Sequence, residues 1–176
     1  MKKIMISIAL FFTHISYATA HTQMFSFTGV LAGIQHPLTG IDHLAALIAV
    51  GILAARQTGK IKQLLMPMVF LSTVFVGFAI AQTEQFTLLA ENIIVISLWV
   101  LGVLLFLGNA YRNALLPVLV AVFGLAHGHA HGIEVIGTPF SFASGMLLTY
   151  CTLMALVIIV CNYDKFHNRK YNNKIA

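Results

Sequence analysis

Two short clusters of ionisable side chains interrupt a sequence that is otherwise strongly apolar. The first cluster lies at the start of one apolar segment and contains His36, Asp42 and His43. The second, at the end of another, contains His127, His131 and Glu134. An ionisable group at bilayer depth is costly and therefore predicts a functional site. Imidazole nitrogen with carboxylate oxygen, and no thiolate, suits borderline divalent ions such as nickel, cobalt or zinc. Together, the clusters predict a metal or proton pathway.

The first cluster contains a proline that affects its backbone. Proline suits the first turn of a helix and pushes the residue before it into an extended conformation. We therefore expect a helix to begin at Pro37, with His36 just outside it. Residues seven apart return to nearly the same helix face, because 3.6 residues make a turn. His36 and His43 then share a face, with Asp42 beside them, if the turn around Pro37 stays roughly helical.

The second cluster also has helical spacing. His127 and His131 are four residues apart, and Glu134 is seven from His127, so all three share a face if the helix persists. His129 points elsewhere in this arrangement. Glycines recur every four residues here, and small residues at that spacing allow close approach between membrane helices. These glycines are Gly124, Gly128 and Gly132.

The composition indicates what surrounds the clusters. Of the 176 residues, 59% are hydrophobic and 9% are charged, whereas a soluble domain carries about 25% charge. So little charge between long apolar runs predicts an all-α, polytopic membrane helix bundle. The net charge of +5 does not indicate nucleic-acid binding, because Lys and Arg form short clusters and no continuous basic face. Cys151 and Cys161 are too few for a disulfide framework and do not resemble a zinc site.

The order of apolar stretches predicts a cleavable signal peptide followed by about five transmembrane helices. Residues 1–20 have a basic start, an apolar centre and a small-residue cleavage site. Residues 21–176 are expected to form a single transmembrane domain that begins at His21. Residues 24–35 are too few to cross about 30 Å of hydrocarbon and predict an interfacial or re-entrant segment. The five spans are expected at residues 37–55, 64–81, 86–107, 115–130 and 140–160.

The basic residues predict the orientation, because short cytoplasmic loops collect Lys and Arg. With the mature N-terminus outside, as a signal peptide requires, every basic residue of the mature chain falls inside. The outer connections, residues 82–85 and 131–139, contain none. The chain is therefore expected to be N-out and C-in, with both clusters and Glu91 at one depth on the outer side. The inner basic residues are Arg56, Lys60, Lys62, Arg112, Lys165, Arg169, Lys170 and Lys174.

The two clusters resemble the signatures of a known family. The pattern His-Pro-x-x-Gly-x-Asp-His, from His36 to His43, resembles the first-span signature of the HupE/UreJ family. The pattern His-Gly-x-Ala-His-Gly-x-Glu, from His127 to Glu134, resembles its second signature. That family is understood as small nickel permeases, some carrying cobalt, found with hydrogenase or urease genes. The resemblance implies these metal-binding positions: His36, Asp42, His43, Glu91, His127, His131 and Glu134.

The resulting prediction is a multi-pass transporter of the bacterial inner membrane, a permease for nickel first and cobalt second that supplies hydrogenase or urease maturation. Ni²⁺ or Co²⁺ is its cargo, and we expect no enzymatic activity, prosthetic group or nucleic-acid partner. The ion is expected to be captured by the second cluster and passed to the first cluster and Glu91. The alternatives are a membrane haem protein with paired imidazoles as axial ligands, a metal-binding or sensor protein and, last, a metallohydrolase. The metal, the driving ion, the oligomeric state and the parts of His129 and His21 stay open.

Overall fold

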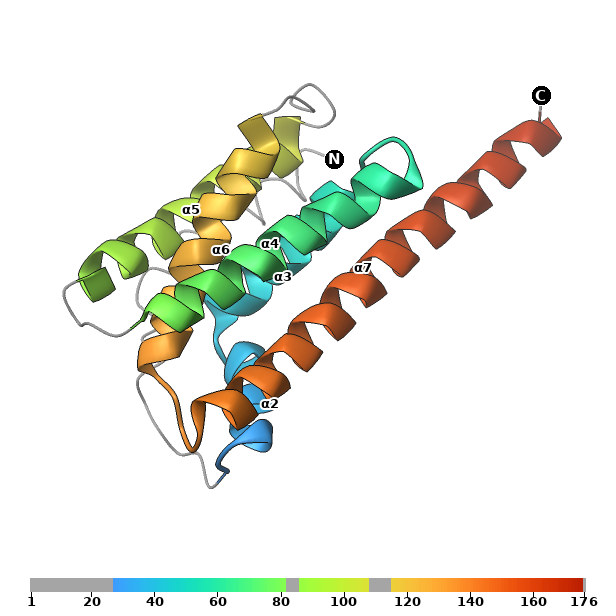
Figure 1. Cartoon of the computed structure of the whole chain (residues 1–176). Coiled ribbons are helices and arrows are strands. Elements are labelled where there is room, and N and C mark those ends of the chain that lie inside the picture. Colours follow the sequence, from blue (N-terminus) through green and yellow to red (C-terminus); the bar gives the residue numbers. More distant parts are fainter. Residues whose placement is uncertain (1–26, 82–85, 108–114, 176) are drawn as a thin grey trace.

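A computed structural model describes residues 27–81, 86–107 and 115–175, and all the regular structure within these ranges is helical. Four helices are long and apolar enough to cross a membrane, and two shorter ones, bent by 81° where they meet, make a fifth candidate span. The predicted all-α membrane bundle is confirmed (Figure 1). The signal-peptide prediction falls on residues that lie outside the described ranges. The helices are α2 (Val30–Thr39), α3 (Ile41–Ala55), α4 (Lys60–Ile80), α5 (Thr87–Leu107), α6 (Leu115–Ile133) and α7 (Pro139–Ile175).

The last helix is longer than a bilayer requires. At about 1.5 Å per residue, the 37 residues of α7 span about 55 Å, against about 30 Å of hydrocarbon. Its apolar part, Pro139–Tyr163, matches the predicted span at residues 140–160. The helix then continues into the polar C-terminal sequence and projects past the other helices, as the red end of the ribbon shows in Figure 1.

The start of the first span differs from the prediction. Pro37 lies inside α2 and not at the first turn of a helix, and the chain breaks at Gly40, whose backbone is extended (φ −77°, ψ 104°). Proline removes only one helical hydrogen bond, the one to the carbonyl of Gly33. Packing of α2 on α7 outweighs that loss, because Gly33 lies so close to Phe142 that a Cβ there would overlap its carbonyl. The short segment before the span is therefore a ten-residue helix that ends at Thr39.

Glycines bring α4 and α6 into close contact. A Cβ on Gly124, Gly128 or Gly132 would collide with α4, and at Gly128 it would overlap the carbonyl of Val74. Gly77 of α4 faces the backbone of Leu125 in the same way. The predicted close approach at four-residue spacing is confirmed. In α6, 56% of the apolar window is buried, compared with 22–28% in α4, α5 and α7, so α6 is the most enclosed of the four long helices.

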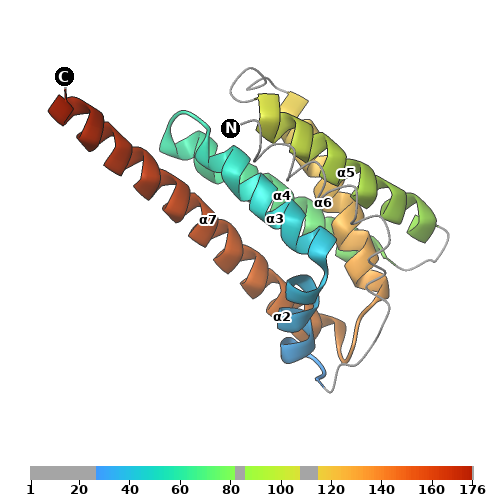
Figure 2. The same cartoon turned by 180° about the vertical axis from the view of Figure 1, so that it is seen from behind.

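The helices run alternately between two ends of the bundle. Figures 1 and 2 show that α3 begins, α6 ends and α7 begins at the same end, which we call the histidine end because it holds His36, His43 and His131. The opposite end, here the basic end, holds Arg56, Lys60 and Lys62, at the connection between α3 and α4. The ionisable clusters and the described basic residues thus lie at opposite ends, as the topology requires. Which end faces outside stays a prediction, and Arg112 lies outside the described ranges.

Candidate metal site at the histidine end

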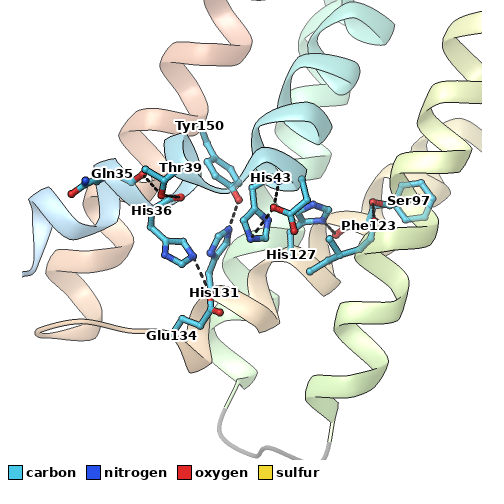
Figure 3. Close-up of polar contacts among 12 residues, drawn as sticks. Gln35, His36, Thr39, His43, Ser97, Phe123, His127, His131, Glu134 and Tyr150 are labelled. Carbon is cyan, nitrogen blue, oxygen red and sulfur yellow. Dashed lines mark hydrogen bonds and ion pairs between the residues drawn. The ribbon is translucent and has the colours of Figure 1, made fainter. Parts of the chain in front are cut away.

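Three buried imidazoles from three helices meet at the histidine end. One ring nitrogen from each of His36 in α2, His43 in α3 and His131 in α6 lies within 4.8 Å of the others. His131 is fully buried, and the other two are each 4% exposed. Figure 3 shows these rings turned toward one another between the helices. Residues of the two sequence clusters therefore converge, as their chemistry predicted.

The bend at Gly40 brings His36 and His43 together. The expected reason was a shared face of one continuous helix, but the chain turns by 81° between the two residues. Their ring centroids are nevertheless 5.9 Å apart. A Cβ at Gly40 would come within 2.6 Å of the His43 ring, so glycine leaves the room that this ring occupies. Thr39 supports the break by donating its hydroxyl to the carbonyl of His36 at 3.1 Å.

Two carboxylates lie at the edge of this group. Glu134 directly follows α6, and its Oε2 is 2.9 Å from Nε2 of His36. Asp42 accepts a hydrogen bond from the backbone N–H of His43 at 2.9 Å, and the same oxygen is 4.0 Å from Nε2 of that histidine. Their side chains are 24% and 22% exposed, unlike the enclosed imidazoles. The carboxylates therefore place negative charge where the group meets its surroundings.

The fourth span ends one turn later than predicted. The expected helix stopped at residue 130, whereas α6 continues to Ile133 and includes His131. Gly132 permits the extra turn, because it fits against Phe78 of α4 and Ala81, the residue after α4, with no room for a Cβ. As a result His127 and His131 lie one helical turn apart in the same helix, as their spacing predicted.

His127 extends the group toward the bundle interior. Its side chain is fully buried, and its ring centroid is 5.3 Å from that of His43 and 5.8 Å from that of Phe70. Nδ1 of His127 is 2.8 Å from the carbonyl oxygen of Phe123. A carbonyl only accepts, so Nδ1 carries the proton and Nε2 keeps the lone pair that a metal needs. Fixing the tautomer through the other ring nitrogen is typical of metal-ligating histidines.

The side chains of the two clusters alternate in space and do not form two separate binding sites, one after the other. Ring centroids are 4.8 Å apart for His36 and His131, 4.3 Å for His131 and His43, and 5.3 Å for His43 and His127. The rings therefore do not place the whole second cluster before the first, and the order of capture stays a prediction. His127 and Glu134, which were expected to act together, lie at opposite ends of this row, because seven residues separate them along α6, about 10 Å of helix.

Glu91 and His129 are placed differently. Glu91 lies in the second turn of α5 with an exposed side chain, and its part in metal binding stays a prediction. His129 is buried and lies beside Phe86, with ring centroids 6.3 Å apart, so it points away from the group as its spacing predicted. His21 lies outside the described ranges.

Tyr150 is a member of the site that the sequence reasoning missed. It comes from α7, is fully buried, and its hydroxyl oxygen is 2.6 Å from Nε2 of His131 (Figure 3). Buried tyrosines usually find a partner for the hydroxyl. A tyrosine in the middle of the last apolar span was therefore the available signal, although nothing in the sequence indicates which partner it has.

The imidazoles carry polar atoms that the protein leaves unpaired. Within the described residues, Nδ1 of His43, Nε2 of His127 and Nδ1 of His131 are buried and have no hydrogen-bond partner. An unsatisfied buried polar group costs about 1–3 kcal/mol. A cation bound by lone pairs of this group would recover part of that cost. The packed rings suit a compact ion better than a haem, because a planar macrocycle between axial ligands would have to separate them.

Comparisons with known proteins identify relatives of the chain. The family model described as "HupE / UreJ protein" matches residues 8–175. The chain is also 32% identical, over 145 residues, to the protein HupE of Rhizobium leguminosarum bv. viciae, a match that covers 82% of this chain and 72% of that protein. No solved structure matches the chain.

Proposed function

We propose, from the premise that this chain belongs to the HupE/UreJ family, that it is an inner-membrane permease for nickel, with cobalt as its second cargo. The family is associated with nickel and cobalt transport. We further propose that the imported metal serves the maturation of hydrogenase or urease. The orientation in this proposal is N-out and C-in, with the histidine end facing outward, as the distribution of basic residues favours.

The observation that carries the proposal is the convergence of His36, His43 and His131 on one buried point. These residues come from three helices and from both sequence clusters, so the fold itself assembles the group. Imidazole nitrogens with nearby carboxylate oxygens, and no thiolate, match the ligand preference of Ni²⁺ and Co²⁺. Asp42 and Glu134 would offset the charge of a dehydrated dication.

Exposure is greatest at the two carboxylates, which is where we expect an ion to enter. The Glu134 and Asp42 side chains are 24% and 22% exposed, whereas His36 and His43 are each 4% exposed and His131 and His127 are fully buried. We propose that the ion is captured between Glu134 and His36, is held by His131 and His43, and leaves toward His127 and the bundle interior. Release at the basic end then requires the helices to rearrange.

The membrane potential is a sufficient driving force in this proposal. The chain has no Gly-x-x-x-x-Gly-Lys-Ser/Thr phosphate loop. A cation moving toward a negative interior gains about 2.3 kcal/mol per charge for each 100 mV. Proton exchange is the other source of energy, and dissipating each gradient in turn distinguishes them.

Nickel accumulation by cells with and without the gene tests the function. At limiting metal, we expect cells with the protein to accumulate more ⁶³Ni²⁺, and His131→Ala or Asp42→Asn to abolish the difference. His167→Ala is the matched control, because it removes an exposed imidazole from α7 far from the site. Equal accumulation with and without the wild-type protein, with its presence shown by immunoblot, would contradict the proposal.

A further inference from the structure

Tyr150 contacts the histidine group although neither sequence cluster contains it. Its hydroxyl oxygen is 2.6 Å from Nε2 of His131, and both side chains are fully buried. The phenol ring is itself held in place, because it stacks on Phe70 of α4 with centroids 6.1 Å apart and an angle of 24°. A side chain from α7, supported by α4, therefore sets where the hydroxyl meets a histidine of α6.

The hydrogen-bonding capacity of His131 determines what this contact does. A neutral imidazole has one N–H and one lone pair, and a metal binds the lone pair. Nε2 is occupied by the Tyr150 hydroxyl, whereas Nδ1 is buried without a hydrogen-bond partner. A hydroxyl can donate or accept, so the contact is compatible with either tautomer. When an ion binds the lone pair of Nδ1, the proton stays on Nε2, and His131 then donates to the hydroxyl oxygen.

We infer that Tyr150 is a positioning residue that fixes the His131 ring and accepts from its Nε2–H, so that Nδ1 is presented to the transported ion; the inference rests on the proposed function. Ligating histidines typically donate their other ring N–H to a fixed acceptor, and loss of such a partner costs about 10–100-fold in metal affinity. The phenol also fixes the ring orientation, since its own ring is held by Phe70.

His127 provides an internal comparison. Its Nδ1 donates to the carbonyl oxygen of Phe123, in its own helix, so Nε2 is left for an ion. His131 uses the opposite nitrogen, and its partner comes from another helix. The two histidines of α6 thus present different nitrogens, and of the two only His131 is held through a side chain that mutation can remove.

Cobalt binding to the full-length protein, purified in detergent, tests the inference. We expect Tyr150→Phe, which keeps the ring and removes only the hydroxyl, to raise the Kd for Co²⁺ by about 10-fold or more. The Co²⁺ d–d absorption spectrum should change as well, since it reports ligand geometry. The melting temperature distinguishes this effect from misfolding and should fall by only a few degrees. Tyr163→Phe is the matched control, because this tyrosine is 64% exposed on the same helix.

A double-mutant cycle separates positioning from general packing. If Tyr150 acts through His131, then Tyr150→Phe should weaken Co²⁺ binding no further in a His131→Ala background, measured up to millimolar metal. The same loss in both backgrounds would overturn the inference, as would a Tyr150→Phe protein that binds Co²⁺ with the wild-type Kd and spectrum. Either result leaves the transport proposal standing. A wild-type protein that neither binds Co²⁺ nor imports Ni²⁺ would overturn the proposed function itself.

Discussion

The two ends of the bundle use buried polar groups in opposite ways. At the basic end, amide and guanidinium groups are tied to neighbours: Arg56 donates to the carbonyl of Leu105 at 2.6 Å, and Asn162 donates to the side-chain oxygen of Gln63 at 3.1 Å. Gln63 in turn donates to the carbonyls of Ala55 and Gln57. At the histidine end, within the part of the chain that the structure describes, Nδ1 of His43, Nε2 of His127 and Nδ1 of His131 are buried without a hydrogen-bond partner.

This difference distinguishes polar residues that join helices from polar residues that are available to bind a ligand. The bonds at the basic end join α3 to α5 and α4 to α7, so their loss should lower stability and leave metal affinity unchanged. The unpaired nitrogens at the histidine end contribute little to stability, because burial without a partner is a cost. Their loss should lower transport and leave stability largely unchanged. Substitutions at each end test this separation.

The largest effect is expected from His43→Ala. The His43 ring lies between those of the other three histidines, with centroids 5.9, 4.3 and 5.3 Å from His36, His131 and His127. Nickel uptake at limiting metal should fall by more than about 100-fold, beyond the loss of an outer-shell partner. The melting temperature should stay the same or rise, because an unpaired buried group is removed. Uptake at the wild-type rate would show that the histidine end is not needed for transport and would contradict the comparison.

Gly128→Val should give the largest loss of stability. Any Cβ at this position overlaps the carbonyl of Val74, so α4 and α6 must separate. Overpacking of this kind costs about 1–3 kcal/mol, and backbone contact leaves little room for relief. Thermal unfolding in detergent measures it, and size-exclusion chromatography gives the folded fraction. An unchanged melting temperature would show that the close packing of these helices is not needed.

A smaller loss is expected from Arg56→Lys at the basic end. The substitution keeps the positive charge that supports the orientation, but lysine cannot reproduce the guanidinium contact with Leu105. We expect a loss of about 1–2 kcal/mol, since hydrogen bonds to charged groups are stronger than average and this one is partly exposed. The metal concentration for half-maximal uptake should not change. A shift in that concentration would show that the two ends are coupled.

The smallest effect is expected from Asn162→Ala. It removes one hydrogen bond, from Asn162 to Gln63, at a site that is only partly buried. A single neutral hydrogen bond contributes about 0.5–1.5 kcal/mol. The melting temperature should fall slightly while uptake per folded protein remains constant. A loss of uptake without a loss of stability would assign Asn162 to transport and not to helix packing.

The sequence predicted the bundle and the convergence of the two clusters. Apolar runs of membrane length and ionisable residues within them can both be recognised directly in the sequence. It could not predict why His36 meets His43. That contact depends on the packing of Gly33 against α7. Because of this packing, α2 continues past Pro37, and the helix ends at Thr39, just before Gly40. It also could not predict Tyr150, whose partner lies on another helix. Both features depend on contacts between helices, which residue spacing within one segment cannot predict.

X-ray absorption at the nickel K-edge of the purified, nickel-loaded protein tests the central claim most directly. If residues of both clusters hold one ion, the first shell should contain about three imidazole nitrogens at roughly 2.0–2.1 Å, taking the metal–imidazole distance known for Zn²⁺ as the guide. His36→Ala and His131→Ala should each remove one imidazole from that shell. An all-oxygen shell, or a spectrum that neither substitution changes, would contradict the assembly of one metal site from the two clusters.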